Sequence, residues 1–416
     1  MADAVGLVTR VHRRLASAGH ALPVRLWEGT RLGPQDAEFV VVLQQPWALR
    51  AMLVPASDLA IGEAYVHDDF DVEGSMVAAL RAAADLASDM GRLRRLAVGA
   101  DVLRLPRPPR RPTARRARVS GRLHSRGRDA QAVRFHYDLG NDFFQLYLDE
   151  EMVYSCAYFA EDDDDLDRAQ VRKLDLVCRK LHLRPGERFL DIGCGWGALL
   201  VHAVRRYGVQ AVGVTLSAEQ AALARERVTA AGLDDRVEVH VTDYRDVTGT
   251  FDAIASIGMV EHVGVRNLPT YFATARRLLR PGGRFLNHGI TPGQRNEARR
   301  LSEDRGSFVG AHVFPDGELV PTWMAVQHMQ RAGFEVLDVE ELRPHYARTL
   351  QHWVRRLEAN ADVACKAGGE EAYRVWRAYM AGSVVGFESR DLGVVQVLGS
   401  VGADVPPGRD WMLPTA

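Results

Sequence analysis

Apolar residues near the start of the chain form short runs between turn signals. Residues 26–33 (LWEGTRLG) and 38–46 (EFVVVLQQP) predict short strands, and residues 75–87 (SMVAALRAAADLA) have the spacing of a helix. Together these patterns predict a small α+β domain over residues 1–97.

From about residue 130 the pattern changes to regular alternation of strands and helices. An acidic block at 161–167 (EDDDDLD) favours a helix start, because acids suit the positive end of a helix. Val171, Leu174, Val177 and Leu181 then recur at helical spacing. The alternation continues through RFLDIG, ALLVHAVRRYG, VQAVGVTL, AEQAALARERVTAAG, RVEVHVTD, FDAIASIG, YFATARRLL and GRFLNHGI.

Strands and helices of these lengths predict an α/β domain with a doubly wound, Rossmann-like parallel sheet over residues 131–404, followed by a tail at 405–416. Ser217 and Gln220 form a capping box for one helix, and Gly232 is placed to end it. Residues 293–326 and 345–390 interrupt the alternation, and we interpret them as helical insertions that cover the site.

The segment between the two domains, residues 98–130, is predicted to be a linker. Between Arg104 and Arg128 it contains ten arginines, four prolines and no acid, and the prolines prevent a continuous helix. Two compatible interpretations remain open: a solvated, disordered connection, or an electrostatic tether to anionic lipid headgroups. Nucleic-acid binding is disfavoured, because no aromatic side chains are interleaved with the arginines.

Composition narrows the function classes. The formal net charge of −1 argues against a polycation built for nucleic acid. The four cysteines form no CxxC pair, so we expect reduced thiols in the cytoplasm and no zinc site. We find no signal-peptide pattern and no apolar run of about 18 residues.

The main chemical motif is LDIGCGWGALL, a glycine loop between a strand and a helix. Glycines allow close approach of a ligand, and the helix N-terminus favours polar or anionic groups. A dinucleotide site would show GxGxxG with an acid about 20 residues later. Here the spacing is GxGxG, and Asp191 lies two residues before Gly193. This pattern is similar to the S-adenosylmethionine site of class I methyltransferases, which would add Gly195 to the cofactor contacts.

The second strand ends in VTLS, without the carboxylate that usually binds the ribose in that fold. Thr215, Leu216, Ser217 and Gln220 occupy the region, either as a capped helix start alone or as cofactor contacts. Asp243 and Tyr244 follow the third strand, where adenine is usually held.

These departures, together with several ordered motifs, indicate one family. HYDLGNDFFQLYLD, MVYSCAYF, SIGMVEHVG, VFPDGEL and AYMAGSVVGFESRDLGVVQVL occur in the expected order around the glycine loop. Over residues 130–400 the chain closely resembles the cyclopropane-fatty-acyl-phospholipid synthases and mycolic-acid cyclopropane synthases. The small domain is similar to the N-terminal domain of the phospholipid-acting members.

The resemblance implies transfer of a methyl group from S-adenosylmethionine to a cis double bond, followed by loss of a proton to a bound bicarbonate. It assigns the anion to the side chains of Glu261, His288 and Tyr379 and to backbone near Cys156 and Ile290. Tyr154, Ser155 and Ile257 are implied cofactor contacts. A dry, aromatic pocket would protect the carbocation, and Tyr137, Phe143 and Phe144 either line this pocket or belong to the core.

Other residues have less distinctive interpretations. His262 is either structural or in contact with the reacting groups, whereas Cys194 and Trp196 are expected to pack on the loop. A metal site is disfavoured, since Glu261, His262 and His288 match no common ligand spacing. Ser383 stands where many phospholipid-acting members have cysteine, and we expect activity to survive that change.

Four functions remain to be compared. The first is cyclopropanation of phospholipid acyl chains, and the second is a methylene branch on the same substrate, which a partner reductase would convert to a methyl branch. The third is methylation of a small soluble nucleophile, and the fourth is lipid binding without chemistry. For the first two we expect peripheral attachment to the inner face of the cell membrane, through the arginine stretch and the apolar surface of the small domain. We also expect no nucleic-acid partner and possible homodimers.

Overall fold

The computed structural model describes residues 2–16, 21–111, 116–137, 139–293, 306–402, 405–406 and 408–412. The chain divides into two compact units. The first contains residues 1–118, 305–315 and 357–385, and the second contains residues 119–304, 316–356 and 386–416. In the described part of the chain, no helix is both long and apolar enough to cross a membrane.

The first unit is a small mixed sheet with helices. Its sheet has the order β2-β1-β3-β4, in which β1 and β3 are parallel and the other pairs antiparallel. The elements are α1 (Ala2–Ala16), β1 (Val24–Arg25), β2 (Arg31–Leu32), β3 (Phe39–Leu43), α2 (Ala48–Leu53), α3 (Asp58–Val66), β4 (Phe70–Gly74), α4 (Met76–Asp89), α5 (Arg92–Val102), α13 (Phe308–His312) and α16 (Ala361–Gly368). This agrees with the α+β expectation.

The second unit is built on a seven-stranded sheet of order β10-β11-β9-β8-β5-β6-β7. Strands β9 to β7 are parallel neighbours, and β11 runs antiparallel to both β9 and β10. The strands are β5 (Arg188–Ile192), β6 (Gln210–Thr215), β7 (Val237–Val241), β8 (Phe251–Ile257), β9 (Leu279–Pro292), β10 (Glu335–Glu341) and β11 (Leu392–Ser400). The predicted α/β fold is confirmed.

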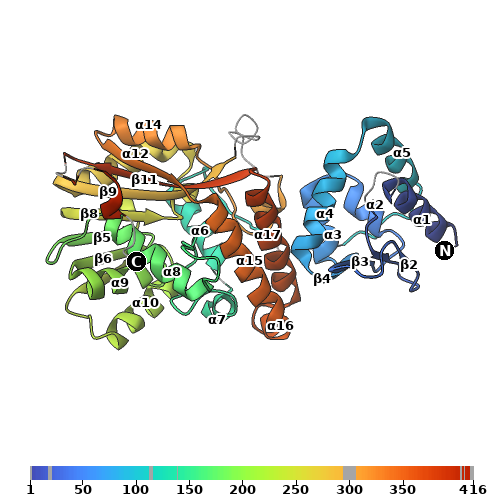
Figure 1. Ribbon diagram of the computed structural model, residues 1–416, viewed down its shortest axis with the longest axis horizontal. Helices are drawn as coiled ribbons and strands as arrows, with labels where there is room; N and C mark the ends of the chain where they lie inside the picture. The colour runs from blue at the N-terminus through green and yellow to red at the C-terminus, as the bar shows by residue number, and fades with distance from the viewer. Residues whose placement is uncertain are drawn as a thin grey trace. The chain divides into compact units, whose positions relative to one another are not determined.

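Helices cover both faces of this sheet (Figure 1). One apolar cluster joins the sheet to α8, α9 and α10, and a second joins it to α11, α12 and α14. The helical elements are α6 (Arg126–Tyr137), α7 (Asn141–Gln145), α8 (Leu166–Lys180), α9 (Ala198–Tyr207), α10 (Ala218–Ala230), η1 (Tyr244–Asp246), α11 (Val260–Val263), η2 (Val265–Asn267), α12 (Leu268–Leu278), α14 (Thr322–Arg331) and η3 (Asp410–Met412). Helices α15 (Arg343–Ala359) and α17 (Glu370–Glu388) contribute residues to both units.

Local signals read from the sequence place several helix ends correctly. Asp165, within the acidic block, caps α8 by accepting a hydrogen bond from the Arg168 N–H. Ser217 caps α10 in the same way, and Gly232 follows its end with a φ of 68°. Val171, however, is 39% exposed, so it lies outside the buried face of α8 that Leu174 and Val177 form.

The expected linker at 98–130 is shorter than predicted. Helix α5 extends to Val102, because Val98 and Val102 bury their side chains against Val11 of α1. At the other end α6 begins at Arg126. Residues 112–115, which include one of the prolines, lie outside the described residues.

Several arginines of this segment are ion-paired. Their pairs are Arg111 with Asp69 and Arg116 with Glu63 in the first unit, and Arg126 with Asp246 and Arg128 with Asp316 in the second. The segment is therefore attached to the folded units at several points, which a freely solvated linker would not be.

Two other boundaries also differ from the expectation. Residues 357–385 join the first unit because Arg374 and Arg377 are buried there: the Arg374 guanidinium donates to the Tyr65 carbonyl over 3.0 Å, and that of Arg377 donates to the Val72 carbonyl over 3.0 Å. The expected tail at 405–416 is partly packed, because Met412 is buried in the core of the second unit.

Candidate active site

The glycine loop joins β5 to α9 at the carboxyl edge of the parallel strands, which is where ligands bind in such sheets. Gly193 and Gly197 both have a φ of 84°, a region that favours glycine. A Cβ at Gly193 would lie 3.3 Å from the Met259 side chain, and one at Gly197 would lie 3.1 Å from Cβ of Ala224. The loop thus passes close to both α10 and the segment after β8.

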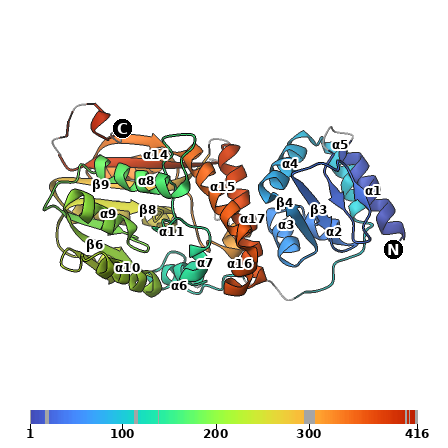
Figure 2. The same cartoon turned by 60° about the horizontal axis from the view of Figure 1, so that its bottom comes forward.

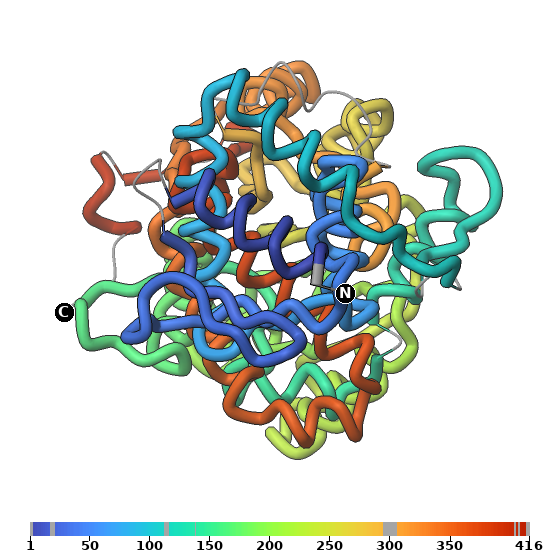
Figure 3. The backbone as a smooth tube through the Cα atoms, turned by 90° about the vertical axis from the view of Figure 1, so that its right-hand side faces the viewer, coloured from blue at the N-terminus to red at the C-terminus, as the bar shows by residue number. Residues whose placement is uncertain are grey.

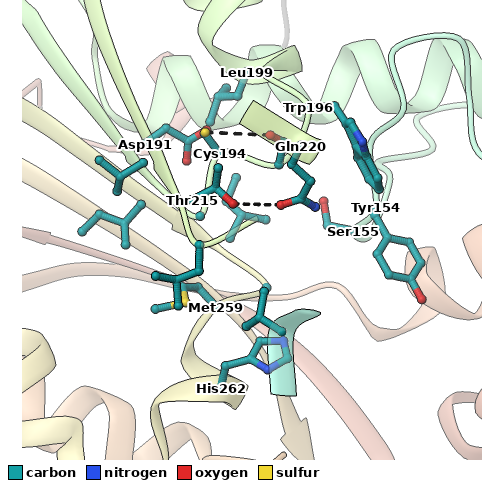
Figure 4. A pocket seen from close by; sticks show the side chains of 18 of the residues that line it. Tyr154, Ser155, Asp191, Cys194, Trp196, Leu199, Thr215, Gln220, Met259 and His262 are labelled. Atoms are coloured by element: carbon teal, nitrogen blue, oxygen red, sulfur yellow. Dashed lines mark hydrogen bonds between the residues drawn. The ribbon is translucent and has the colours of Figure 1, made fainter. Parts of the chain in front are cut away.

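One pocket gathers almost all of the expected cofactor contacts (Figure 4). Ser217 is the exception, because its hydroxyl caps α10. The expected residues that line the pocket are Tyr154, Ser155, Asp191, Gly193, Gly195, Thr215, Leu216, Gln220, Asp243, Tyr244 and Ile257. They come from the ends of β5, β6, β7 and β8 and from the segment before α8, so tertiary structure brings distant motifs together.

The end of β6 presents amide and hydroxyl groups to this pocket. The Thr215 hydroxyl donates to Oε1 of Gln220 over 2.9 Å, as Figure 4 shows, and the Ser217 N–H donates to the same hydroxyl over 3.2 Å. Since Gln220 accepts this bond through its oxygen, its amide nitrogen is directed away from Thr215. A polar ligand at this edge would therefore meet neutral groups instead of a carboxylate.

Asp243, by contrast, does not present a free carboxylate to the pocket. The Arg245 guanidinium donates to both of its oxygens, over 2.7 Å and 2.6 Å. Burial alone would raise the pKa of Asp243, but the bonds from Arg245 outweigh it and lower the pKa. The neighbouring Tyr244 ring is buried among apolar side chains and has Arg245 over its face.

Lys173 is a pocket residue that sequence reasoning missed. It is 1% exposed, and its Nζ donates to Oγ of Ser155 over 2.8 Å. Burial lowers the pKa of Lys173 to about 8. Burial also raises the pKa of Asp191 to about 7, although the positive charge of Lys173 acts to lower it. A signal was present: Lys173 and Lys180, seven residues apart on α8, both lie on its buried side.

Aromatic rings enclose one side of the pocket. The Tyr154 ring centroid lies 5.2 Å from that of Trp353 and 5.5 Å from that of Phe144. Trp196 packs on Phe144 at 5.4 Å and donates through Nε1 to Oδ1 of Asn141. Phe143 and Phe144 are fully buried, in agreement with the core interpretation, whereas Tyr137, Tyr154 and Trp196 line the pocket itself.

Glu261 and His288 are buried on neighbouring segments. Glu261 lies on α11 after β8, and His288 lies on β9, where it pairs with Ile257 of β8. Nδ1 of His288 is 3.2 Å from the Gln396 amide nitrogen. Among the described residues, Oε2 of Glu261 and Nε2 of His288 are buried and have no hydrogen-bond partner. Such groups are costly to bury unpaired, so a polar ligand that contacted either atom would be stabilised.

The protonation of both groups follows from burial. Burial raises the pKa of Glu261 to about 7, although the hydrogen bond from the Ile290 N–H opposes the shift. Burial lowers the pKa of His288 to about 3, so the imidazole is neutral at physiological pH. The Ile290 N–H donates to Oε1 of Glu261 over 2.6 Å and is therefore already engaged. The expected contact of the anion with backbone near Ile290 stays a prediction.

The other two expected catalytic residues are Cys156 and Tyr379. Cys156 is fully buried, and burial raises the pKa of its thiol far above its usual value, so it is no thiolate nucleophile. Tyr379 belongs to the first unit, where its ring packs on Phe314 with centroids 5.7 Å apart. Its role at the anion site stays a prediction.

A buried histidine supports the segment that carries Glu261. Nε2 of His124 is 3.4 Å from Oε1 of Glu318, and its Nδ1 is 3.8 Å from Oδ1 of Asp129. Burial would lower the pKa of His124, but the two carboxylates outweigh burial and raise it to about 9. Glu318 in turn accepts a hydrogen bond from the Val265 N–H and donates its own N–H to the Glu261 carbonyl.

His262, next to Glu261, lines the pocket, and burial lowers its pKa to about 4. Within the described residues, no group of three or more histidine, cysteine and acidic side chains could hold a metal ion. The pocket is lined by the glycine loop, by polar and ionisable side chains that include Lys173 and Asp191, and by aromatic rings. Glu261 and His288 are buried on adjoining segments.

Comparison with known proteins identifies similar chains. The model of the mycolic acid cyclopropane synthetase family matches residues 124–397. A probable fatty acid methyltransferase of Pseudomonas putida is 39% identical over 381 residues, which cover 91% of each chain. The tuberculostearic acid methyltransferase UfaA1 of Mycobacterium tuberculosis is 34% identical over 411 residues, covering 95% of this chain and 91% of the relative.

One similar solved structure was crystallised with a ligand derived from the cofactor. The mycolic acid cyclopropane synthase CmaA1, crystallised with S-adenosylhomocysteine (SAH) and CTAB, is 36% identical. It covers 65% of this chain and 98% of its own, with a TM-score of 0.62.

Proposed function

Because this chain belongs to the mycolic acid cyclopropane synthetase family of S-adenosylmethionine-dependent methyltransferases, we propose that it methylates the cis double bond of an unsaturated phospholipid acyl chain and closes a cyclopropane ring. The observation that carries the proposal is that Glu261 Oε2 and His288 Nε2 are buried without a hydrogen-bond partner. Both residues adjoin the pocket lining, because Glu261 lies between Met259 and His262 in the chain and His288 pairs with Ile257.

The pocket residues fit S-adenosylmethionine. The glycine loop leaves room for close approach, and neutral groups at Thr215 and Gln220 would meet the ribose side. When bound, the cofactor supplies an electrophilic methyl group on a sulfonium. Tyr154 and its ring neighbours exclude water and offer π faces to positive charge that develops on the acyl chain.

The carboxyl–imidazole pair suits a small oxyanion that carries one proton. Neutral His288 donates through Nε2, since Gln396 occupies its Nδ1 side, and Glu261 accepts a hydrogen bond at Oε2. Bicarbonate has both a donor and acceptors, and when bound there it would supply the base that removes a proton. Tyr379 is proposed as a further donor.

The proposal is tested with vesicles of oleoyl phospholipid, S-adenosylmethionine and the purified protein. Mass spectrometry should show one added methylene unit per modified chain, unaltered by mild hydrogenation because a ring has no alkene. Absence of any added carbon would overturn the proposal. If the protein methylated a small soluble nucleophile without lipid as fast as it methylated phospholipid, a methyltransferase of small soluble substrates would be favoured instead.

A methylene-branched product is the second candidate. It is favoured by the similarity to a relative named tuberculostearic acid methyltransferase over 95% of this chain. The two routes share the pocket and the base and differ in which carbon loses its proton. Mild hydrogenation separates them, because it raises the mass of an exocyclic alkene and leaves the ring unchanged.

The proposed substrate lies within a membrane, so the proposal includes contact with a membrane surface. We propose peripheral attachment at the cytoplasmic face through basic side chains, each contributing about 1 kcal/mol near an anionic surface. High salt should weaken vesicle binding. If the product is the methylene branch, a reductase partner would be needed to convert it to a methyl branch. A homodimer is also proposed, and light scattering would reveal it.

A further inference from the structure

Helix α5 has two apolar faces. Helix α5 lies beside α1 in the first unit (Figure 2 and Figure 3). One of its faces packs there, where Val98 and Val102 bury against Val11. On the other side Leu93, Leu96 and Leu103 are 84%, 63% and 54% exposed. They are the three most exposed large apolar side chains of the described residues.

These leucines form a stripe along the helix and its C-cap. At about 100° per residue, positions 93, 96, 100 and 103 fall within an arc of about 80°, opposite Val98 and Val102. Ala100 is exposed in this stripe. A single exposed leucine needs no explanation, whereas a continuous apolar stripe on a surface helix indicates an interaction surface.

The charges around the stripe indicate what covers it. Residues 92–111 contain seven arginines and one acid, Asp101. Asp101 is buried and ion-paired with Arg14 at 3.0 Å and with Arg104 at 3.6 Å. Arg92 and Arg104 flank the leucine stripe in the helical projection. The exposed side of α5 is therefore apolar with basic margins, the composition of helices that lie in the interface of an anionic membrane.

Some neighbouring arginines are engaged within the protein. Arg95 donates to the carbonyls of Ala87 and Met90, and Arg111 pairs with Asp69. Arginines of α5 and of the segment after it are therefore partly committed to the fold, so apolar contact would add to any electrostatic attraction.

We propose that α5 is an interfacial membrane helix, which lies in the plane of an anionic lipid surface with Leu93, Leu96 and Leu103 among the acyl chains. Arginines at its margins contact the phosphates. This inference rests on the proposed function, since a substrate within the bilayer requires such contact, and it assigns attachment to a specific helix of the first unit.

The test is sedimentation of the full-length protein with vesicles of mixed phosphatidylglycerol and phosphatidylethanolamine. Each buried methylene group contributes about fourfold to partitioning, so L93A/L96A should bind at least about tenfold more weakly. V363A is the matched control, because Val363 is a 50% exposed aliphatic residue of the same unit on α16. R92Q should reduce binding to anionic vesicles and have little effect on phosphatidylcholine vesicles.

Methyl transfer to detergent-dispersed phospholipid separates this inference from the proposed function. L93A/L96A should retain activity in micelles and lose it on vesicles. Unchanged vesicle binding by L93A/L96A would overturn the inference, and so would light scattering showing that the variant instead loses self-association. A protein that binds vesicles through α5 but never transfers a methyl group would contradict only the proposed function.

Discussion

Lys173 on α8 donates a hydrogen bond from Nζ to Oγ of Ser155, and the two atoms are 2.8 Å apart. Both residues line the pocket, so the bond connects the aromatic segment around Tyr154 to the helix beneath it. The Lys173 charge also opposes the burial of the Asp191 carboxylate. This contact connects the upstream aromatic motif to the glycine loop.

Replacing Lys173 with methionine should weaken cofactor binding. The variant keeps the volume of the side chain and removes a charged hydrogen bond of about 1.5–3 kcal/mol, so we expect the Kd for SAH to rise about tenfold to a hundredfold. Calorimetric titration measures this. K366M is the control, since Lys366 is exposed on α16, and equal affinities for the two variants would contradict the assignment.

Glu261→Gln should reduce turnover and spare cofactor affinity. The amide keeps an oxygen for the Ile290 N–H, but its other end no longer accepts a hydrogen bond from the anion's OH. Loss of a positioned proton-transfer apparatus costs about 100-fold to 10,000-fold in rate. Single-turnover methyl transfer and SAH titration should separate the two effects, and an unimpaired rate would remove Glu261 from the mechanism.

The pH dependence of folding should change in the same variant. The pKa of Glu261 is raised from 4.5 to about 7 in the folded protein, so the folded state binds the proton more tightly than the unfolded one. The contribution of protonated Glu261 to the stability of the fold is complete below pH 4.5 and is lost as the pH rises through 7. E261Q should therefore gain stability relative to the unmodified protein over this window, by about 3 kcal/mol. Urea unfolding at several pH values checks the sign.

His124→Gln should loosen the segment that carries Glu261. The folded-state pKa of about 9 lies above the usual 6.5, so the pairing of His124 with Asp129 and Glu318 stabilises the fold fully below pH 6.5 and ceases to do so as the pH passes 9. The gap in unfolding free energy between H124Q and the unmodified protein should therefore be largest below pH 6.5 and should close at alkaline pH, which urea unfolding at several pH values measures.

A second variant tests the same support without removing the imidazole. Gly264 has a φ of 79°, and a Cβ there would lie 2.3 Å from the His124 ring. G264A should therefore displace His124 and lower turnover together with stability. A fully active, fully stable G264A would show that this contact does not position Glu261.

Much of the fold follows from local patterns. Periodicity and glycine spacing predict the strands and helices around the sheet, since those signals act over a few residues. Asp165 and Ser217 predict helix starts for the same reason. Boundaries at 97 and 404 were less predictable: Val98, Val102 and Met412 are ordinary apolar residues until a distant partner buries them.

The sequence by itself determined the chemistry of the motifs: a glycine loop with Asp191 and a strand end without a carboxylate. The base-site roles of Glu261 and His288 come from the family resemblance and stay a prediction. Only the tertiary structure decided that Lys173 reaches Ser155, that the Ile290 N–H is committed to Glu261, and that His124 lies between Asp129 and Glu318. The physical reason is that hydrogen bonding and burial depend on which residues distant in the chain become neighbours, whereas helix and strand periodicity depends on nearby residues alone.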